Sequence, residues 1–209
     1  MPHKTQLTNS LKNYQQEFQS VVPFDPVKDK LLLLDFTDKN KELTDEILSD
    51  TNKFSDYITN KLHSSGSKYG IGGYAEHRTI YNRSKHFDSP TGEEPRRLHL
   101  GIDIWGAVST PVIAPVSGIV HSFAFNNNFG DYGATIILSH VIDGISFHTL
   151  YGHLSFNSLK NISEGDFIDK GDIFSEFGMQ FENGHWPAHL HFQVIIDMKD
   201  NKGDYIGVC

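Results

Sequence analysis

The pattern of apolar and polar positions changes near the middle of the chain. From residue 98 onward, short apolar runs alternate with polar turn segments rich in Gly, Asn and Asp. The runs cover residues 98–105, 111–123, 133–141, 145–154, 167–178 and 189–196. Strands at this spacing, without helical periodicity between them, are typical of an antiparallel all-β domain. We therefore predict a mainly β protein, built as a small antiparallel β-sandwich or barrel.

The first third of the chain has a different pattern. Residues 5–22 predict a short amphipathic helix, and 31-LLLLDF-36 is consistent with a buried strand. Between residues 40 and 62, apolar side chains recur at spacings of four and seven, which places them on one face of a helix. This part therefore predicts an N-terminal α-helical extension.

A Ser/Gly loop, 64-SSGSKYGIGG-73, separates the two patterns. We place the domain boundary there, with an N-terminal helical extension over residues 1–66 and a main domain over residues 67–209. Inside the main domain, the polar segment 84–97 predicts an exposed connection because it contains Pro and Gly.

Composition narrows the function classes. The chain has 209 residues and a net charge of −8, which argues against nucleic acid as a partner because a phosphate-backbone binder shows a basic face. No apolar run approaches the length of a membrane span. The first residues lack the apolar segment of a secretory signal, so we expect a cytoplasmic protein, or a periplasmic or extracellular one if the sequence is truncated. The only cysteine is Cys209, which excludes an internal disulfide. The oligomeric state stays open.

Two histidines lie one residue apart in the last apolar run, 187-PAHLHFQVII-196. In a strand, His189 and His191 point to the same face, because side chains alternate with a period of two. Two parallel imidazoles fit a metal site, a proton relay or a shared partner. The alternative is the wet face of an edge strand.

A second pair lies in 98-LHLGIDIW-105, where His99 and Asp103 share one strand face with Gly101 between them. The glycine leaves room for a metal or a substrate, and His and Asp are both zinc ligands. A surface ion pair explains the same pattern. In 147-FHTLYGHLS-155, His153 lies two residues after Tyr151 and shares its face if the strand persists.

Together these runs provide five candidate side chains: His99, Asp103, His153, His189 and His191. A catalytic zinc needs three protein ligands and an open position, which leaves two residues for acid–base work. The chain has no H-E-x-x-H pair and no G-x-S-x-G elbow, so a helix-borne zinc protease and a serine hydrolase are both disfavoured.

The motifs 99-HLGID-103, 151-YGHL-154 and 189-HLHF-192 resemble those of the lysostaphin/LytM-type zinc metallopeptidases. The connecting segments 110–120 and 164–178 are also similar, and the resemblance covers about residues 97–197. Within that family, the chain looks closest to a subgroup that lacks a signal peptide and occurs within larger chains.

The resemblance implies a small β-sandwich or barrel with Zn²⁺ as the cofactor. It implies zinc ligands at His99, Asp103 and His191, and a catalytic pair at His153 and His189. The expected activity is a metalloendopeptidase that cuts peptide bonds in peptidoglycan-type or other short peptides. The resemblance does not indicate which of the two histidines is the general base.

Some members of the family use a tyrosine upstream of the first ligand, and the nearest upstream candidate here is Tyr81, which lies far outside that spacing. Arg78, Tyr81 and Arg83 are candidates for binding a substrate carboxylate. A solvated arginine face is the alternative.

Other functions remain as alternatives. Segments 113–120 and 164–174 also resemble biotinyl and lipoyl carrier domains, but the interval 121–163 holds only Lys160 and no lysine hairpin. A cupin would need further ligands after His191, and residues 192–209 contain no histidine. A degenerate peptidase kept as a zinc-binding or scaffold module, and a cytoplasmic zinc amidohydrolase acting on a small molecule, are the remaining alternatives.

Overall fold

All six predicted apolar runs contain strands in the computed structural model, which describes residues 2–88 and 94–209. The strands are β3 (Ile102–Trp105), β4 (Pro111–Ile113), β5 (Gly118–Asn126), β6 (Gly133–Ile142), β7 (Ile145–Leu154), β8 (Phe167–Ile168), β9 (Ile173–Glu176) and β10 (His189–Ile195). The prediction of a mainly β protein with an antiparallel sheet is therefore confirmed.

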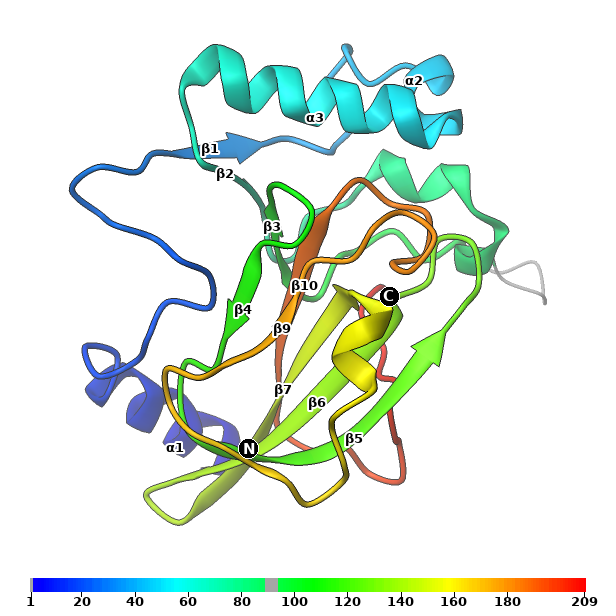
Figure 1. The fold of residues 1–209 in the computed structure, drawn as a ribbon. Coiled ribbons are helices and arrows are strands. Elements are labelled where there is room, and N and C mark those ends of the chain that lie inside the picture. Colours follow the sequence, from blue (N-terminus) through cyan, green and yellow to red (C-terminus); the bar gives the residue numbers. More distant parts are fainter. Residues whose placement is uncertain (1, 89–93) are drawn as a thin grey trace.

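Two sheets form the β-domain (Figure 1). The larger one has the order β1-β2-β3-β10-β7-β6-β5-β8, and β4 and β9 form a separate pair. The central hairpin of β6 and β7 turns through Asp143 and Gly144, which both have positive φ (52° and 74°). Such two-residue loops match the twist of the strands that they join. The long hairpin places β7 beside β10, where the histidine motif lies.

The N-terminal segment adds to this sheet as well as covering it. β1 (Leu31–Leu34) pairs with β2 (Tyr69–Gly72), and this pairing is parallel, whereas β2 is antiparallel to β3. β1 is an edge strand whose Leu33 is 82% exposed, so it is less buried than its sequence predicts. The predicted boundary near residue 66 lies between two strands that pair in one sheet, and the division into two parts stays a prediction.

The helices differ from their predicted ranges. The first is α1 (Pro2–Asn13), and residues 40–62 give two helices, α2 (Asp45–Ser49) and α3 (Thr51–Ser65). Asp50 ends α2 and caps α3, because its side chain accepts hydrogen bonds from the Asn52 and Lys53 amides. α2 and α3 lie over the β1–β2 end of the sheet, whereas α1 lies at the far end near the β6–β7 turn (Figure 1).

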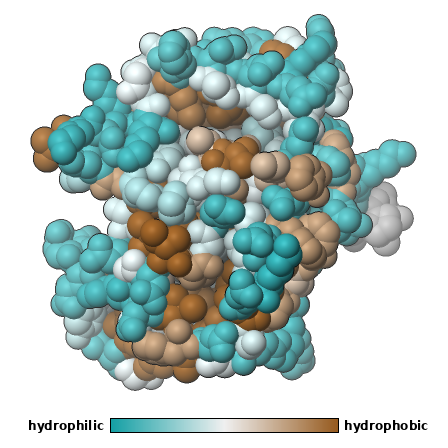
Figure 2. All heavy atoms as spheres, viewed as in Figure 1, coloured by the Kyte–Doolittle hydropathy of each residue, from teal (hydrophilic) through white to brown (hydrophobic). Residues whose placement is uncertain are grey.

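Two short 3₁₀ helices, η1 (Thr79–Arg83) and η2 (Lys85–Phe87), follow β2, and η3 (Phe156–Leu159) follows β7. Residues 89–93 of the predicted exposed connection lie outside the described residues. No helix in the described ranges is long and apolar enough to cross a membrane. Figure 2 shows apolar side chains gathered along the middle of one face, between hydrophilic borders.

Two apolar clusters fix the strands that carry the histidines. One fills the space between the large sheet and the β4–β9 pair, and it contains Leu190 and Tyr151. The other joins the N-terminal helices to the sheet, where Phe36, Phe54 and Trp105 are each fully buried. Each such side chain stabilises the fold by roughly 2 kcal/mol or more on burial. The second cluster lies directly behind His189.

Candidate metal centre and active site

The pairing of β3 with β10 sets the positions of four side chains. His191 pairs directly with Asp103, and His189 pairs directly with Trp105. Residues directly opposite each other project to the same face of a sheet, and so do residues two apart in one strand. The two pairs therefore form consecutive rungs on one face.

His99 reaches the same place from outside the strand. β3 begins at Ile102, later than its sequence predicts, and His99 instead forms an isolated bridge with Val208. Gly101 makes the approach possible, because a Cβ atom there would lie 2.5 Å from the ring of His191. The glycine between His99 and Asp103 is thus required by the ring packed against it.

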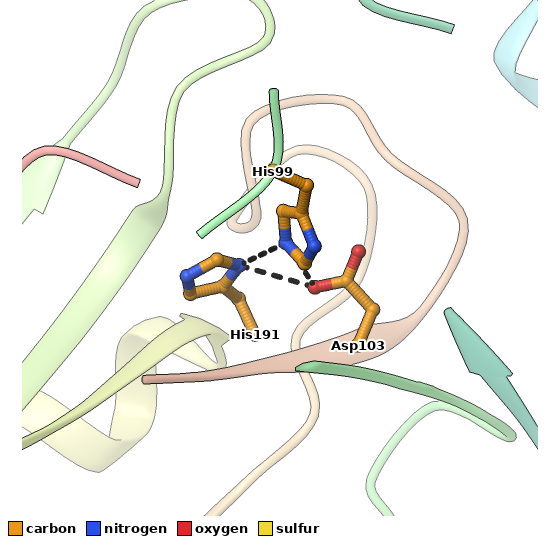
Figure 3. Close-up of side chains that lie close together, drawn as sticks. All are labelled: His99, Asp103 and His191. Carbon is orange, nitrogen blue, oxygen red and sulfur yellow. Dashed lines mark hydrogen bonds and ion pairs between the residues drawn. The ribbon is translucent and has the colours of Figure 1, made fainter. Parts of the chain in front are cut away.

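Three donor atoms converge on one point (Figure 3). The Nε2 atom of His99 lies 2.9 Å from Nδ1 of His191 and 3.2 Å from Oδ1 of Asp103. His191 Nδ1 lies 3.1 Å from the same Asp103 oxygen. All three residues are buried, with at most 3% of their surface exposed.

Hydrogen bonds on the far side of each ring fix the tautomers. His99 Nδ1 donates to the carbonyl oxygen of Gly73 at 3.0 Å, so Nε2 carries the lone pair of the neutral ring. His191 Nε2 donates to Oε1 of Gln193 at 3.1 Å, so its lone pair is on Nδ1. The Gln193 amide is oriented in turn, because its Nε2 donates to the carbonyl of Ile206.

This arrangement fits a metal ion. Two nitrogen lone pairs and a carboxylate oxygen face one another, which is repulsive unless a cation or a proton lies between them. In a tetrahedral zinc site with bonds near 2.0 Å, neighbouring ligand atoms are about 3.3 Å apart. The observed separations of 2.9–3.2 Å are close to that value. The donor set therefore suits zinc, with one position left for water.

The charges around Asp103 keep it ionised. Burial raises the pKa of its carboxyl group, but His99 and Arg78 oppose this and hold the pKa well below its ordinary value. Burial also lowers the pKa of His99, against the opposing effect of Asp103. A neutral histidine and an ionised carboxylate are the forms that bind metals.

His153 reaches the site through an irregularity in β7. The β6–β7 register shifts between Ala134 and Ile136, and His153 has a φ of +63°. The regular alternation would place His153 with Tyr151, as its spacing predicts, but Tyr151 faces the apolar core opposite Phe192. This expectation was wrong, because the bulge turns the backbone at His153.

His153 and His189 lie against each other, with ring centroids 4.1 Å apart. Each Nδ1 atom donates to a backbone carbonyl at 2.8 Å, that of Asn183 for His153 and that of Pro187 for His189. The lone pair of each neutral ring is therefore on Nε2. The His189 ring also stacks on Trp105, with centroids 3.8 Å apart and planes 9° apart.

Burial keeps this pair uncharged at neutral pH. It lowers the pKa of His153 well below the ordinary value, and the nearby His189 and His191 add to the effect. Burial lowers the pKa of His189 to about 4, although Asp103 opposes it. Both rings are therefore neutral at pH 7, with a lone pair on Nε2.

A cavity of about 270 Å³ connects these groups. His153, His189, His191 and Asp103 all line it, together with the apolar side chains of Trp186 and Ile206. Residues 204–208 form part of its wall. A hydrogen bond from the Leu100 amide to the Gly207 carbonyl holds this segment beside the site. The volume suits a small segment of a ligand.

The predicted substrate-binding residues lie in different environments. Tyr81 and Arg78 line the cavity, but the Arg78 side chain is already paired with Asp103 and Glu76. Among the residues that the structure describes, Arg83 does not line the cavity, and its guanidinium packs over aromatic rings such as that of Trp186. A role in substrate binding stays a prediction for all three.

Two site residues were missed from the sequence. Trp105 carries no polar motif, and its contact with His189 depends on strand register. Tyr132 lines the cavity with its hydroxyl 3.5 Å from His191 Nε2, and Gly152 and Gly207 leave the space that its side chain fills. The position of Tyr132 in a loop before β6 gave no signal.

A buried donor set for a metal, with two neutral histidines beside it, defines the chemistry of a metal-dependent hydrolase. Residues 97–204, just over half of the chain, match the model of Peptidase family M23. The chain therefore belongs to Peptidase family M23, a family of metallopeptidases, which are hydrolases.

The chain is also similar to several solved peptidase structures. The catalytic domain of the antimicrobial peptidase lysostaphin from Staphylococcus simulans is 25% identical, with 69% of this chain and 88% of that chain covered and a TM-score of 0.44. A second structure of lysostaphin is 28% identical, covering 48% and 39%, with a TM-score of 0.35. A zinc-containing peptidase from Vibrio cholerae is 20% identical, covering 52% and 30%, with a TM-score of 0.39.

All three TM-scores lie below 0.5, so family membership rests on the family model rather than on these likenesses. This chain spans less than half the length of the Vibrio cholerae chain and of the second lysostaphin chain. No match was found among curated proteins.

Proposed function

We propose that this protein is a zinc-dependent metallopeptidase that hydrolyses peptide bonds in short peptides, including those of the peptidoglycan type. One observation carries the proposal: three lone pairs from His99, Asp103 and His191 converge on one buried point beside two neutral histidines. Peptidase family M23 supplies the reaction class.

His99 Nε2, Asp103 Oδ1 and His191 Nδ1 would hold the metal. When bound there, zinc would act as a Lewis acid and lower the pKa of a coordinated water toward ~7. The protein contributes a preorganised donor set, because Gly73 and Gln193 already fix the orientation of both imidazole ligands.

His153 and His189 would move the protons. Hydrolysis of a peptide bond needs a base for the attacking water and an acid for the leaving amine. Each ring can accept a proton at Nε2, because its Nδ1 is held by a backbone carbonyl. After one ring has taken the proton of water at Nε2, that Nε2–H can be donated to the leaving nitrogen or can bond the developing oxyanion. The division of these roles stays open.

The test is hydrolysis of a short-peptide library by the full chain, followed by mass spectrometry. We expect cleavage that stops on treatment with a zinc chelator and returns when zinc is added. His153→Ala serves as the matched control, because it should lower cleavage by about 10²–10⁴-fold while the protein still binds zinc. Cleavage that survives both the chelator and the substitution would overturn the proposal.

A further inference from the structure

The two carboxylate oxygens of Asp103 have different partners. Oδ1 faces the nitrogen atoms of His99 and His191, as Figure 3 shows. Oδ2 accepts a hydrogen bond from Nη1 of Arg78. The carboxylate is therefore divided between the proposed metal position and a buried cation.

Arg78 occupies a site built for its guanidinium. The side chain is fully buried, its Nε donates to Glu76 Oε2 at 2.7 Å, and it packs 5.2 Å from the ring centroid of Phe36. Gly72 provides the space, because a Cβ atom there would lie 2.6 Å from Nη2 of Arg78. The guanidinium brings a permanent positive charge to this site, because arginine stays protonated in proteins.

The same short segment also orients the first histidine. The carbonyl oxygen of Gly73 accepts from His99 Nδ1 at 3.0 Å and from Arg78 Nη2 at 3.3 Å. Residues 72–78 thus contact two of the three proposed ligands. They precede residue 97, where the match to the family model begins.

We propose that Arg78 is a positioning residue of the metal centre, which holds Oδ2 of Asp103 and thereby presents only Oδ1 to the metal. This inference rests on the proposed function. A guanidinium suits the task because its rigid fork can bond Asp103 and Glu76 at the same time, which a lysine ammonium cannot do in the same geometry. Partners that orient metal ligands typically change metal affinity by 10–100-fold when they are removed.

The experiment measures zinc affinity of the full chain by competition with a chromogenic chelator, for wild type, Arg78→Gln and Arg78→Lys. We expect affinity to fall by about 10–100-fold in Arg78→Gln and by less in Arg78→Lys, which keeps the charge. Arg83→Gln is the matched control. It removes a second partly buried arginine, which packs on Phe54 and Trp186, and it should leave zinc affinity unchanged.

A second readout separates positioning from general stability. Visible absorption of the Co²⁺-loaded protein reports ligand geometry, and it should change in both Arg78 variants but not in Arg83→Gln. If Arg78→Gln fails to fold, as judged by thermal unfolding, Arg78→Lys decides alone.

The outcomes separate the two proposals. Suppose that wild type binds zinc, and that folded Arg78 variants have the same zinc affinity and the same Co²⁺ spectrum as wild type. This result would overturn the positioning role and leave the proposed function intact. Failure of wild type to bind zinc would instead overturn the proposed function, and with it this inference.

Discussion

Two consecutive rungs of the β3–β10 ladder have contrasting contacts, one polar and the other mainly apolar. The Asp103–His191 rung is polar, with a carboxylate between imidazole nitrogens and a buried arginine. The next rung pairs His189 with Trp105, and here the histidine ring stacks on an indole that packs against Phe36. One register therefore produces an electrostatic site and an apolar site side by side.

The difference explains why neighbouring histidines can have different roles. His191 lies beside an ionised carboxylate and presents Nδ1 to it, as a metal ligand must. His189 lies against the aromatic ring of Trp105, burial there keeps its ring neutral, and the bond from its Nδ1 to the Pro187 carbonyl leaves Nε2 as the basic atom. Because Trp105 packs in a cluster with Phe36 and Phe54 from the N-terminal segment, that segment takes part in shaping the candidate active site.

Removing the basic nitrogens should have the largest effect. We expect His153→Ala and His189→Ala each to lower kcat/KM by about 10²–10⁴-fold, because proton transfer would lose its acid or base. Zinc content should stay near that of wild type, since neither ring belongs to the donor set. Steady-state hydrolysis of the best library peptide, measured beside metal analysis, checks both statements. An unchanged kcat/KM in His153→Ala would refute its catalytic assignment.

The stacked rung should also make the metal-free protein acid-sensitive. The pKa of His189 falls from 6.5 to about 4 on folding, so below pH 6.5 the unfolded chain binds more protons than the folded one. The contribution of His189 to the free energy of unfolding should therefore be fully present above about pH 6.5. It should decrease as the pH falls toward 4, by about 3 kcal/mol. Urea unfolding in the presence of a chelator, between pH 4 and pH 7.5, measures the slope.

His189→Asn is the comparison for this slope, because it removes the titrating ring. Its stability should depend less steeply on pH than that of wild type. Identical slopes for the two proteins would show that the apolar rung does not hold His189 neutral.

Replacing the indole should have a smaller effect on catalysis. We expect Trp105→Leu to lower kcat on the order of tenfold, because His189 loses the surface that orients it, while zinc binding at the first rung persists. Phe36→Leu is the control, since Phe36 packs on Trp105 from within the aromatic cluster. Equal losses of kcat in the two variants would indicate general loosening of the cluster instead of a specific role for the stack.

Much of this site could be predicted from local spacing. A period of two places His189 and His191 on one face of a strand, and the separation of His99 from Asp103 by a glycine-containing segment indicates a site with space between them. Strand alternation and turn residues also predicted the β-domain. These features depend on residues close together in the sequence, so the local sequence pattern is enough to predict them.

The remaining features depend on long-range packing. Arg78 meets Asp103 only because β2 pairs with β3, and Trp105 meets Phe36 only because the N-terminal segment joins the same sheet. The position of His153 depends on a bulge that the regular period conceals. Its alternation with Tyr151 therefore gave the wrong face, and no local signal indicated Tyr132.

The central claim is that the first rung binds zinc and the second does not, and metal analysis of purified variants tests it most directly. After incubation with zinc and removal of the excess, we predict about one zinc per chain in wild type and in His189→Ala, which alters the second rung. We predict none in Asp103→Ala and His191→Ala. Equal zinc in all four proteins, or none in wild type, would contradict this account.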